Sequence, residues 1–307
     1  MSVLEVKGLS VSLLRYQKRL RRQTQRVIDD LHLSVDAGEI LAVAGASGSG
    51  KSLLAHAILG ILPGHAQVSG AIFYRGKELS SLRRAELMGR EIAYVPQSVL
   101  YLNPLMRVGK QVRTAVRTGD PVAVQRAAFA RFGLSPAVEK RYPFQLSGGM
   151  ARRVLVSIAA VSGANLIIAD EPTPGLDPAV ISESLSLFRE LADRGSAVML
   201  ISHDIGSVLK VADRIAVFCA GTAVEIARAE DFEGNGEALR HPYSRALWRA
   251  LPQNDFTPAP WPVPSSPETS PICPFARGCE RATDACFTNR PEPTWLGNRM
   301  VRCIHGS

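Results

Sequence analysis

The sequence predicts an α/β protein with a mixed core sheet, an antiparallel β subdomain, an inserted helical subdomain and a small cysteine-bearing C-terminal extension. Three observations lead to this prediction. A buried strand, a glycine-rich loop and a helix follow one another over residues 40–62. Apolar residues alternate, as in strands, on both sides of a basic segment near the N-terminus. Helical spacing then replaces the strand pattern from about residue 98 to residue 162.

The glycine-rich loop reads G-A-S-G-S-G-K-S and carries the strongest chemical signal of the chain. Its glycines permit backbone angles that side chains would forbid, so successive N–H groups can surround phosphate oxygens at a helix N-terminus. Lys51 adds charge for the β- and γ-phosphates, and the Ser52 hydroxyl can ligate Mg²⁺. A plain turn is the alternative, but the Lys-Ser ending favours nucleotide binding. The predicted nucleotide-binding residues of this loop are Gly45, Ser47, Gly48, Ser49, Gly50, Lys51 and Ser52.

Length, charge and cysteine content limit the class of protein. The chain has 307 residues, of which 46% are apolar, and this is ample for a folded core. No apolar stretch is long enough to span a bilayer and no signal peptide is recognisable, so we expect a chain kept in the cytosol. The net charge of +8 permits an anionic partner without indicating one. Four of five cysteines lie in the last 35 residues, which favours a metal centre over disulfides.

Apolar spacing also places the other elements. The predicted strands are residues 4–13, 31–35, 40–44, 71–74, 91–95 and 197–201, with an apolar strand beginning at residue 165. The predicted helices are residues 52–62, 82–88, 105–116, 122–132 and 151–160. Pro104 and Pro121 are expected to open two of these helices. The basic segment Arg15–Arg26 is expected to be a solvated hairpin loop rather than a contact for lipid or phosphate.

A second anion site is predicted where the helix at 151–160 begins. The preceding residues read L-S-G-G-M, so Ser147, Gly148 and Gly149 would present their N–H groups at a helix N-terminus. One chain would then contain two phosphate-sized sites.

Polar side chains follow three predicted strands. The strand from residue 165 ends in Asp170 and Glu171, where the first acid can hold Mg²⁺ and the second can polarise an attacking water. Helix capping is the alternative for these acids, but the apolar run before them favours chemistry. Gln97 follows the strand at 91–95 and would point toward the nucleotide edge of the sheet. His203 follows the strand at 197–201, where a lone histidine is more often structural.

These motifs, in this order and spacing, closely resemble an ABC-type ATPase over about residues 1–250. The resemblance implies a head-to-tail dimer in which ATP on the glycine-rich loop of one subunit is closed over by Ser147, Gly148 and Gly149 of the other. It implies four further roles: Mg²⁺ and permease sensing by Gln97, general base catalysis by Glu171, γ-phosphate contact by His203, and communication across the dimer by Asp177.

Finer features narrow the resemblance. Segments 101–111 and 142–150 and the run H-P-Y-S-R-A-L at 241–247 are similar to ATPase subunits of oligopeptide, dipeptide and nickel importers. This implies a peripheral subunit on the cytoplasmic face of the inner membrane, with two permease subunits, an extracytoplasmic substrate-binding protein and a second ATPase subunit of the same or a related kind. Peptide is the first choice of substrate and nickel or a metal chelate the alternative. A soluble ABC ATPase acting on nucleic acid or ribosomes has only the net charge in its favour.

The C-terminal residues are expected to divide into a proline-rich linker, 251–272, and a four-cysteine extension, 273–307. The extension spaces its cysteines as C-x5-C-x6-C-x16-C, and spacing alone leaves zinc, an iron–sulfur cluster and free thiols open. Importer ATPases have a similar tail, and the resemblance implies a [4Fe–4S] cluster. Its ligands would be Cys273, Cys279, Cys286 and Cys303.

The chain departs from the family pattern at three places. Leu13 stands where an adenine-stacking aromatic residue is usual, so stacking must be weak or come from elsewhere, for which Tyr16 is a candidate. Ala151-Arg152-Arg153 replaces Arg-Gln-Arg, and Pro174-Gly175 replaces Thr-Ala. Neither of these last two changes removes a catalytic group.

Overall fold

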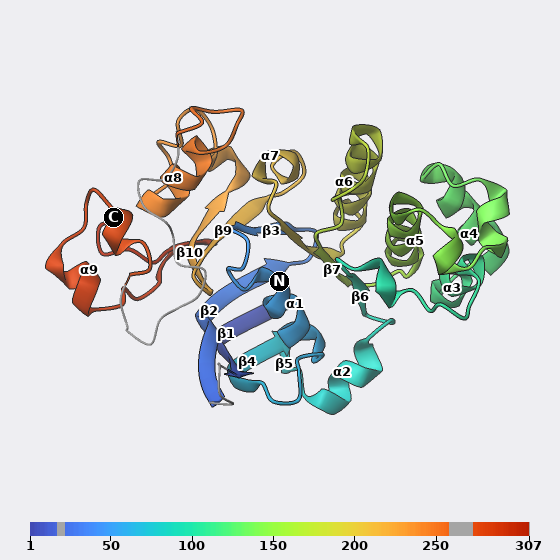
Figure 1. Ribbon diagram of the computed structural model, residues 1–307, viewed down its shortest axis with the longest axis horizontal. Coiled ribbons are helices and arrows are strands. Elements are labelled where there is room, and N and C mark those ends of the chain that lie inside the picture. Colours follow the sequence, from blue (N-terminus) through green and yellow to red (C-terminus); the bar gives the residue numbers. More distant parts are fainter. Residues whose placement is uncertain (17–21, 258–272, 307) are drawn as a thin grey trace. The chain divides into compact units, whose positions relative to one another are not determined.

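The computed structural model describes residues 1–16, 22–257 and 273–306 (Figure 1). These residues form two compact units. Unit 1 consists of Met1, residues 35–40 and residues 80–201. Unit 2 consists of residues 2–34, residues 41–79 and the described residues from Ser202 onward. Among the described residues, no helix combines the length and apolarity needed to cross a membrane.

Unit 1 contains three parallel strands and the inserted helices. The strands are β6 (Ile92–Val95), β7 (Leu166–Asp170) and β8 (Ala197–Ser202), in the order β8-β7-β6. The helices are α2 (Ser81–Leu87), α3 (Val108–Ala115), α4 (Pro121–Arg131), α5 (Gly148–Val161) and α6 (Pro178–Asp193). Helices α3, α4 and α5 pack on one another, which is the arrangement expected of an inserted helical block (Figure 1).

The two prolines predicted to open helices behave differently. Pro121 lies in the first turn of α4, and the Asp120 carboxylate accepts hydrogen bonds from the first free N–H groups of that helix. The prediction for Pro104 is wrong, because α3 begins only at Val108. The Asn103 side chain accepts a hydrogen bond from the N–H of Leu105 at 2.9 Å, so the residues after Pro104 form a turn instead of a helix.

Unit 2 contains the antiparallel β subdomain predicted near the N-terminus. Its four strands are β1 (Ser2–Tyr16), β2 (Arg22–Asp36), β4 (Gln67–Tyr74) and β5 (Lys77–Glu78), in the order β2-β1-β4-β5. The pairs β1–β4 and β4–β5 are antiparallel. The middle of the predicted loop Arg15–Arg26 lies outside the described residues.

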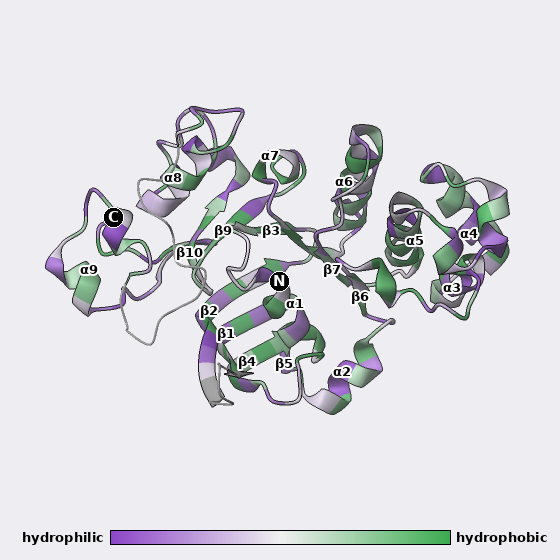
Figure 2. Ribbon diagram, viewed as in Figure 1, coloured by the Kyte–Doolittle hydropathy of each residue, from purple (hydrophilic) through white to green (hydrophobic). Residues whose placement is uncertain are grey.

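A second group of strands in unit 2 carries the glycine-rich loop. Strand β3 (Ile40–Gly45) runs parallel to β9 (Arg214–Cys219), and both are buried along their whole length. Figure 2 shows the hydropathy of their residues. Beyond β9 come β10 (Thr222–Arg228), β12 (Arg299–Val301) and β11 (Thr294–Leu296), all antiparallel to their neighbours. The helices of unit 2 are α1 (Lys51–Leu59), α7 (Ile205–Val208), α8 (Pro242–Arg249) and α9 (Asp284–Thr288).

The cysteine-bearing extension is built into unit 2. Its strand β12 pairs with β10, and Met300 and Val301 are each only 2% exposed. The sequence predicts that the linker separates this extension from the rest of the chain, but the described tail shares a sheet with β9 and β10. Residues 258–272 of the predicted linker lie outside the described residues.

Helix α8 begins at a fully buried histidine. The Nδ1 atom of His241 accepts a hydrogen bond from the N–H of Tyr243 at 3.0 Å, and the Glu225 carboxylate accepts from the N–H of His241 at 3.1 Å. Burial lowers the pKa of His241 to about 3. The ring is therefore a neutral N-cap, and protonation would both charge the core and remove the cap.

His241 should make the stability of the protein depend on pH. An unfolded histidine binds a proton near pH 6.5 and the folded one only near pH 3, so the unfolded state holds more protons between these values. Below about pH 6 this group alone should lower the unfolding free energy by about 1.4 kcal/mol per pH unit. Denaturant unfolding between pH 7.5 and 5 measures the slope. His241→Asn, which keeps a capping acceptor, should flatten it, whereas His65→Asn at an exposed position should leave it unchanged.

Candidate nucleotide-binding site

The glycine-rich loop connects β3 to α1 in unit 2, as the sequence predicts. At Gly45 a Cβ atom would lie 2.3 Å from the carbonyl oxygen of Phe218 in β9, so no larger residue fits there. Gly50, the N-cap of α1, has a left-handed backbone with φ of 100°. Its hypothetical Cβ would lie 3.1 Å from the carbonyl oxygen of Val27 in β2. The loop is thus pressed between β9 and β2, and its glycines are required by close approach as well as by backbone angle.

The ammonium group of Lys51 is held by the backbone at the start of the loop. Lys51 is buried, and its Nζ donates hydrogen bonds to the carbonyl oxygens of Gly45 at 2.8 Å and Ala46 at 2.9 Å. Ser49 is 1% exposed, and its Oγ has no hydrogen-bond partner among the described residues. A buried ammonium and helix N–H groups at one loop form a site suited to a phosphate chain.

Two residues outside the motif also bind the loop. The N–H of Ala46 donates to the hydroxyl of Tyr243, at the start of α8. The N–H of Gly221, in the β9–β10 turn, donates to the carbonyl oxygen of Ser49 at 3.0 Å. The sequence indicates neither contact, although the run beginning His241-Pro-Tyr is similar to the family pattern.

The predicted acids lie at the end of β7 in unit 1. Asp170 is 1% exposed, and the Tyr94 hydroxyl donates to its Oδ2 at 3.4 Å. Burial, followed by the charge of Asp170, raises the pKa of Tyr94, which keeps it a donor. Glu171 is also buried, with a positive φ of 47°. Its N–H donates to the carbonyl oxygen of Ile201 in β8 at 3.0 Å, which fixes this unusual backbone.

Arg152 of α5 joins two of the predicted residues. Its guanidinium donates to the carbonyl oxygens of Glu171 and, at 2.7 Å, of Gln97. Burial lowers the pKa of Arg152, and the nearby charge of Glu171 opposes that effect. Arg152, which the sequence shows only as a departure from the family pattern, therefore brings the backbones of Gln97 and Glu171 together. The catalytic roles predicted for these two residues stay predictions.

The second predicted anion site opens α5. The Ser147 side chain accepts from the N–H of Met150 at 3.3 Å and caps the helix, and Gly148 faces open space where a Cβ would be. A Cβ at Gly149 would lie 3.6 Å from the carbonyl oxygen of Gly175. Asp177 caps α6 by accepting from the N–H of Val180 at 3.1 Å. These contacts give Ser147 and Asp177 local roles in capping, and their predicted roles across a dimer stay predictions.

The remaining predicted residues belong to unit 2. His203 follows β8 and is exposed. Leu13 lies in β1, and the side chain of Tyr16 lies outside the described residues. The candidate residues are therefore divided: the glycine-rich loop and His203 belong to unit 2, and Gln97, Asp170, Glu171 and the L-S-G-G-M motif belong to unit 1.

The four tail cysteines lie near one another. Burial and the neighbouring thiols of Cys303, Cys286 and Cys279 raise the pKa of Cys273 to about 11, and burial also raises the pKa of Cys279 and of Cys303. The thiol of Cys286 lies 3.8 Å from Nε2 of His305. Within the described residues, however, no three His, Cys, Asp or Glu side chains are arranged as a metal site. Cys219, buried in β9, is the fifth cysteine.

Comparisons with known proteins match most of the chain. The profile of the ABC transporter family matches residues 28–174, and that of the oligopeptide/dipeptide transporter C-terminal region matches residues 224–286. The oligopeptide transport ATP-binding protein OppD of Lactococcus lactis subsp. cremoris is 36% identical over 87% of this chain and 82% of its own length. AppD of Bacillus subtilis, also named an oligopeptide transport ATP-binding protein, is 31% identical over 99% of this chain and 96% of its own.

Solved structures resemble the fold. The structure titled as an ATP binding subunit of an ABC transporter has 25% identity and a TM-score of 0.61, and the match covers 75% of this chain and 91% of that one. The ATP-binding cassette MJ0796, solved as a dimer bound to ADP and Pi, has 21% identity and a TM-score of 0.64, with 74% and 98% covered.

Proposed function

The chain belongs to the ATP-binding subunits of ABC transporters, in the oligopeptide/dipeptide transporter family, and from this membership we propose that it powers the import of di- or oligopeptides through a membrane permease. One observation carries the proposal: an ATPase cassette and the C-terminal region of peptide transporters occur in a single chain. The protein is an ATPase of the ABC type, so the proposal concerns its cargo, its site and its partners.

The proposed assembly has four kinds of component. The chain would lie on the cytoplasmic face of the inner membrane and pair head to tail with a second ATPase subunit, identical or related. Two transmembrane permease subunits would bind this pair, and an extracytoplasmic binding protein would deliver the peptide. The paired arrangement would account for the two predicted anion sites of the chain, because each ATP would need one site from each subunit.

Within the ATP site, residues 45 and 47–52 of the glycine-rich loop would bind the phosphates, with Lys51 at the β- and γ-phosphates. Ser52, Asp170 and Gln97 would hold the Mg²⁺ shell, and the metal would neutralise phosphate charge. His203 would contact the γ-phosphate. Ser147, Gly148 and Gly149 would close over ATP bound to the partner subunit, and Asp177 would transmit that closure.

Glu171 would be the general base. Its carboxylate is attached to a backbone that Ile201 and Arg152 hold through hydrogen bonds to both of its peptide groups. A carboxylate with a fixed backbone can keep one orientation toward an attacking water, and burial removes competing solvent. Asp170, one residue earlier, keeps its own orientation through Tyr94.

Uptake measurements test the proposed cargo. Cells in which the gene for this chain is deleted should lose uptake of labelled di- and oligopeptides, and the wild-type chain should restore it. A Glu171→Gln chain, which keeps the fold, should not. Normal peptide uptake in the deleted cells together with loss of nickel uptake would replace peptide by nickel as the cargo.

We also propose that the four tail cysteines ligate a [4Fe–4S] cluster. Four thiols in one small segment match the ligand count and chemistry of that cluster, and mutual repulsion among their thiolates would be relieved by a cationic centre. When bound, the cluster would cross-link segments that are separated by up to 30 residues.

Metal analysis tests the cluster. Protein purified without oxygen should be brown and contain about four iron atoms per chain. Cys279→Ser should lower the iron content strongly, while Cys219→Ser, the matched change at a cysteine in β9, should not. One zinc and no iron would assign the cysteines to zinc instead. If the wild-type protein contains neither iron nor zinc, the proposed cluster is wrong.

A further inference from the structure

The glycine-rich loop is supported by two residues that no step of ATP hydrolysis uses. Tyr243 accepts a hydrogen bond from the N–H of Ala46, and Gly221 donates one to the carbonyl oxygen of Ser49. These contacts act near the two ends of the phosphate-binding turn. A loop that binds phosphate through its backbone N–H groups depends on their orientation, so residues that fix its backbone affect affinity.

Tyr243 is itself held by the tail. Its side chain is 2% exposed, and its ring lies 5.4 Å, centroid to centroid, from the ring of Phe275. Phe275 is 4% exposed and stands two residues after Cys273. On the other side, the N–H of Tyr243 is bound by His241. The hydroxyl therefore reaches Ala46 from the first turn of α8, and its ring packs on Phe275 of the tail.

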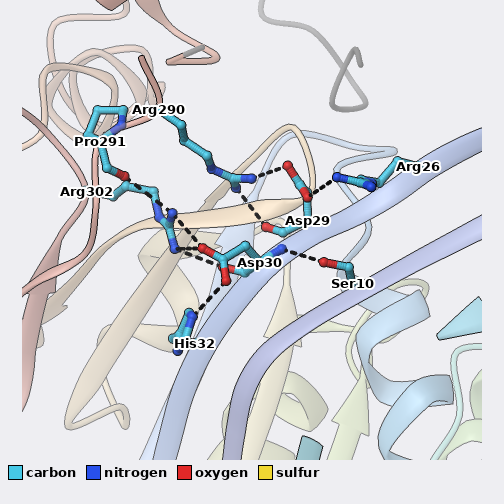
Figure 3. A network of polar contacts seen from close by, with 8 residues as sticks. All are labelled: Ser10, Arg26, Asp29, Asp30, His32, Arg290, Pro291 and Arg302. Atoms are coloured by element: carbon cyan, nitrogen blue, oxygen red, sulfur yellow. Dashed lines mark hydrogen bonds and ion pairs between the residues drawn. The ribbon is translucent and has the colours of Figure 1, made fainter. Parts of the chain in front are cut away.

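Gly221 is held by the tail through Asp29 of β2, and Figure 3 shows the contacts of Asp29 with Arg290. The carbonyl oxygen of Gly221 accepts from the N–H of Asp29 at 3.0 Å. Arg290 of the tail donates to the carboxylate of Asp29 and, at 2.8 Å, to its carbonyl oxygen. A continuous line of contacts thus runs from Arg290 through Asp29 and Gly221 to Ser49.

A second arginine fixes the adjoining residue of β2. Arg302 is 3% exposed and donates to the carbonyl oxygen of Asp30 at 2.9 Å and to its carboxylate at 3.0 Å. Asp30 has a positive φ of 46° and receives further contacts from Ser10 and His32. Burial acts to raise the pKa of Asp30, but the bond to His32 and the charge of Arg302 outweigh it and lower that pKa. Burying the Arg302 charge without the Asp30 carboxylate would cost free energy, so this ion pair favours docking of the tail at this position of β2.

We propose that the cysteine-bearing tail braces the glycine-rich loop, with Tyr243 and Asp29 as positioning residues that carry the effect of Phe275 and Arg290 to the loop backbone. The inference rests on the proposed ATP-binding role of that loop. It explains why a tail far along the chain is built into the unit that contains the loop. Substitutions that loosen the tail should therefore weaken ATP binding. They should affect the catalytic step less, because the proposed general base, Glu171, belongs to the other unit.

Two substitutions in the full-length protein test the brace. Tyr243→Phe removes only the oxygen that accepts from Ala46 and keeps the ring packed on Phe275. Arg290→Gln removes the charge that holds Asp29. Each should weaken ATP binding about threefold to tenfold by calorimetry, and the two together should weaken it more than either alone. The KM for ATP should rise by a similar factor while kcat changes less than about twofold.

Amide hydrogen exchange distinguishes a local effect on the glycine-rich loop from a general loss of stability. The peptide containing Ala46 should exchange faster in Tyr243→Phe, with strands β7 and β8 unaffected. Arg277→Gln, at an exposed tail arginine, is the matched control and should leave both exchange and affinity unchanged. If wild-type protein binds ATP but both variants bind it equally well, the brace is wrong. Wild-type protein that binds no ATP would instead overturn the proposed function of the loop.

Discussion

Glu171→Gln should lower steady-state ATP turnover by about 10² to 10⁴-fold while leaving ATP binding intact. Glutamine has the same shape as glutamate but cannot take a proton from the attacking water. The backbone of residue 171 is held by Ile201 and Arg152, and neither bond involves the side chain, so the substitution should not disturb the local fold. The loss should therefore fall on kcat.

Phosphate release at saturating ATP measures this effect, and calorimetry with ATP and Mg²⁺ measures binding. Glu183→Gln provides the matched control in the same unit, because that glutamate lies on α6 and is 40% exposed in an ion pair with Arg131. Its turnover should stay within about twofold of wild type, since such surface pairs contribute little. Wild-type turnover in Glu171→Gln would remove residue 171 from the role of base.

The fold class and the glycine-rich loop could be predicted because their signals are local. The loop is eight consecutive residues between an apolar strand and a helix, and the structure places them so. The resemblance to peptide-importer ATPases is confirmed by the family profiles and by relatives that cover nearly the whole chain. Where the signal was a single residue, prediction was weaker: Pro121 opens a helix and Pro104 does not, because Asn103 offers the backbone a competing turn.

Contacts between residues far apart in the chain could not be predicted from the sequence. Arg290 and Asp29 are 261 residues apart, and nothing in either neighbourhood indicates the other. The same holds for Tyr243 and Ala46. Arg152 was visible as a departure from Arg-Gln-Arg, but its meaning depends on two carbonyl oxygens, of Gln97 and Glu171, which any residue type would supply. Every residue has a backbone carbonyl oxygen, so composition and spacing cannot indicate which carbonyl a side chain will bind. The role of a residue such as Arg152 is therefore visible only in the structure.

The tail shows a related limit. Prolines and clustered cysteines predict an extended linker and a small metal-dependent appendage, because about thirty residues bury little surface by themselves. The tail instead obtains burial from the rest of unit 2, through β12 on β10 and Arg302 on Asp30. Loss of a cysteine should therefore loosen contacts that reach β2 and the glycine-rich loop, in addition to the tail itself.

Lys51→Ala should weaken ATP binding by about tenfold to 100-fold, the second large effect expected for this protein. The ammonium is buried and rests on the carbonyl oxygens of Gly45 and Ala46, so it is already positioned where phosphate charge would lie. Removing it leaves phosphate oxygens without a charged donor in a site that water enters poorly. Calorimetric titration with ATP and Mg²⁺ measures the loss.

Lys51→Met separates the charge from the packing of the side chain. Methionine fills nearly the same buried volume, so a loss equal to that of alanine assigns the effect to the ammonium. Lys210→Ala, at an exposed position of the same unit, should bind ATP as wild type does. The defect should also be larger for ATP than for ADP, because only ATP has the γ-phosphate that Lys51 is proposed to contact. Equal affinity for ATP in wild type and in both Lys51 variants would contradict the phosphate contact, since no other consequence of the substitution could restore the missing charge.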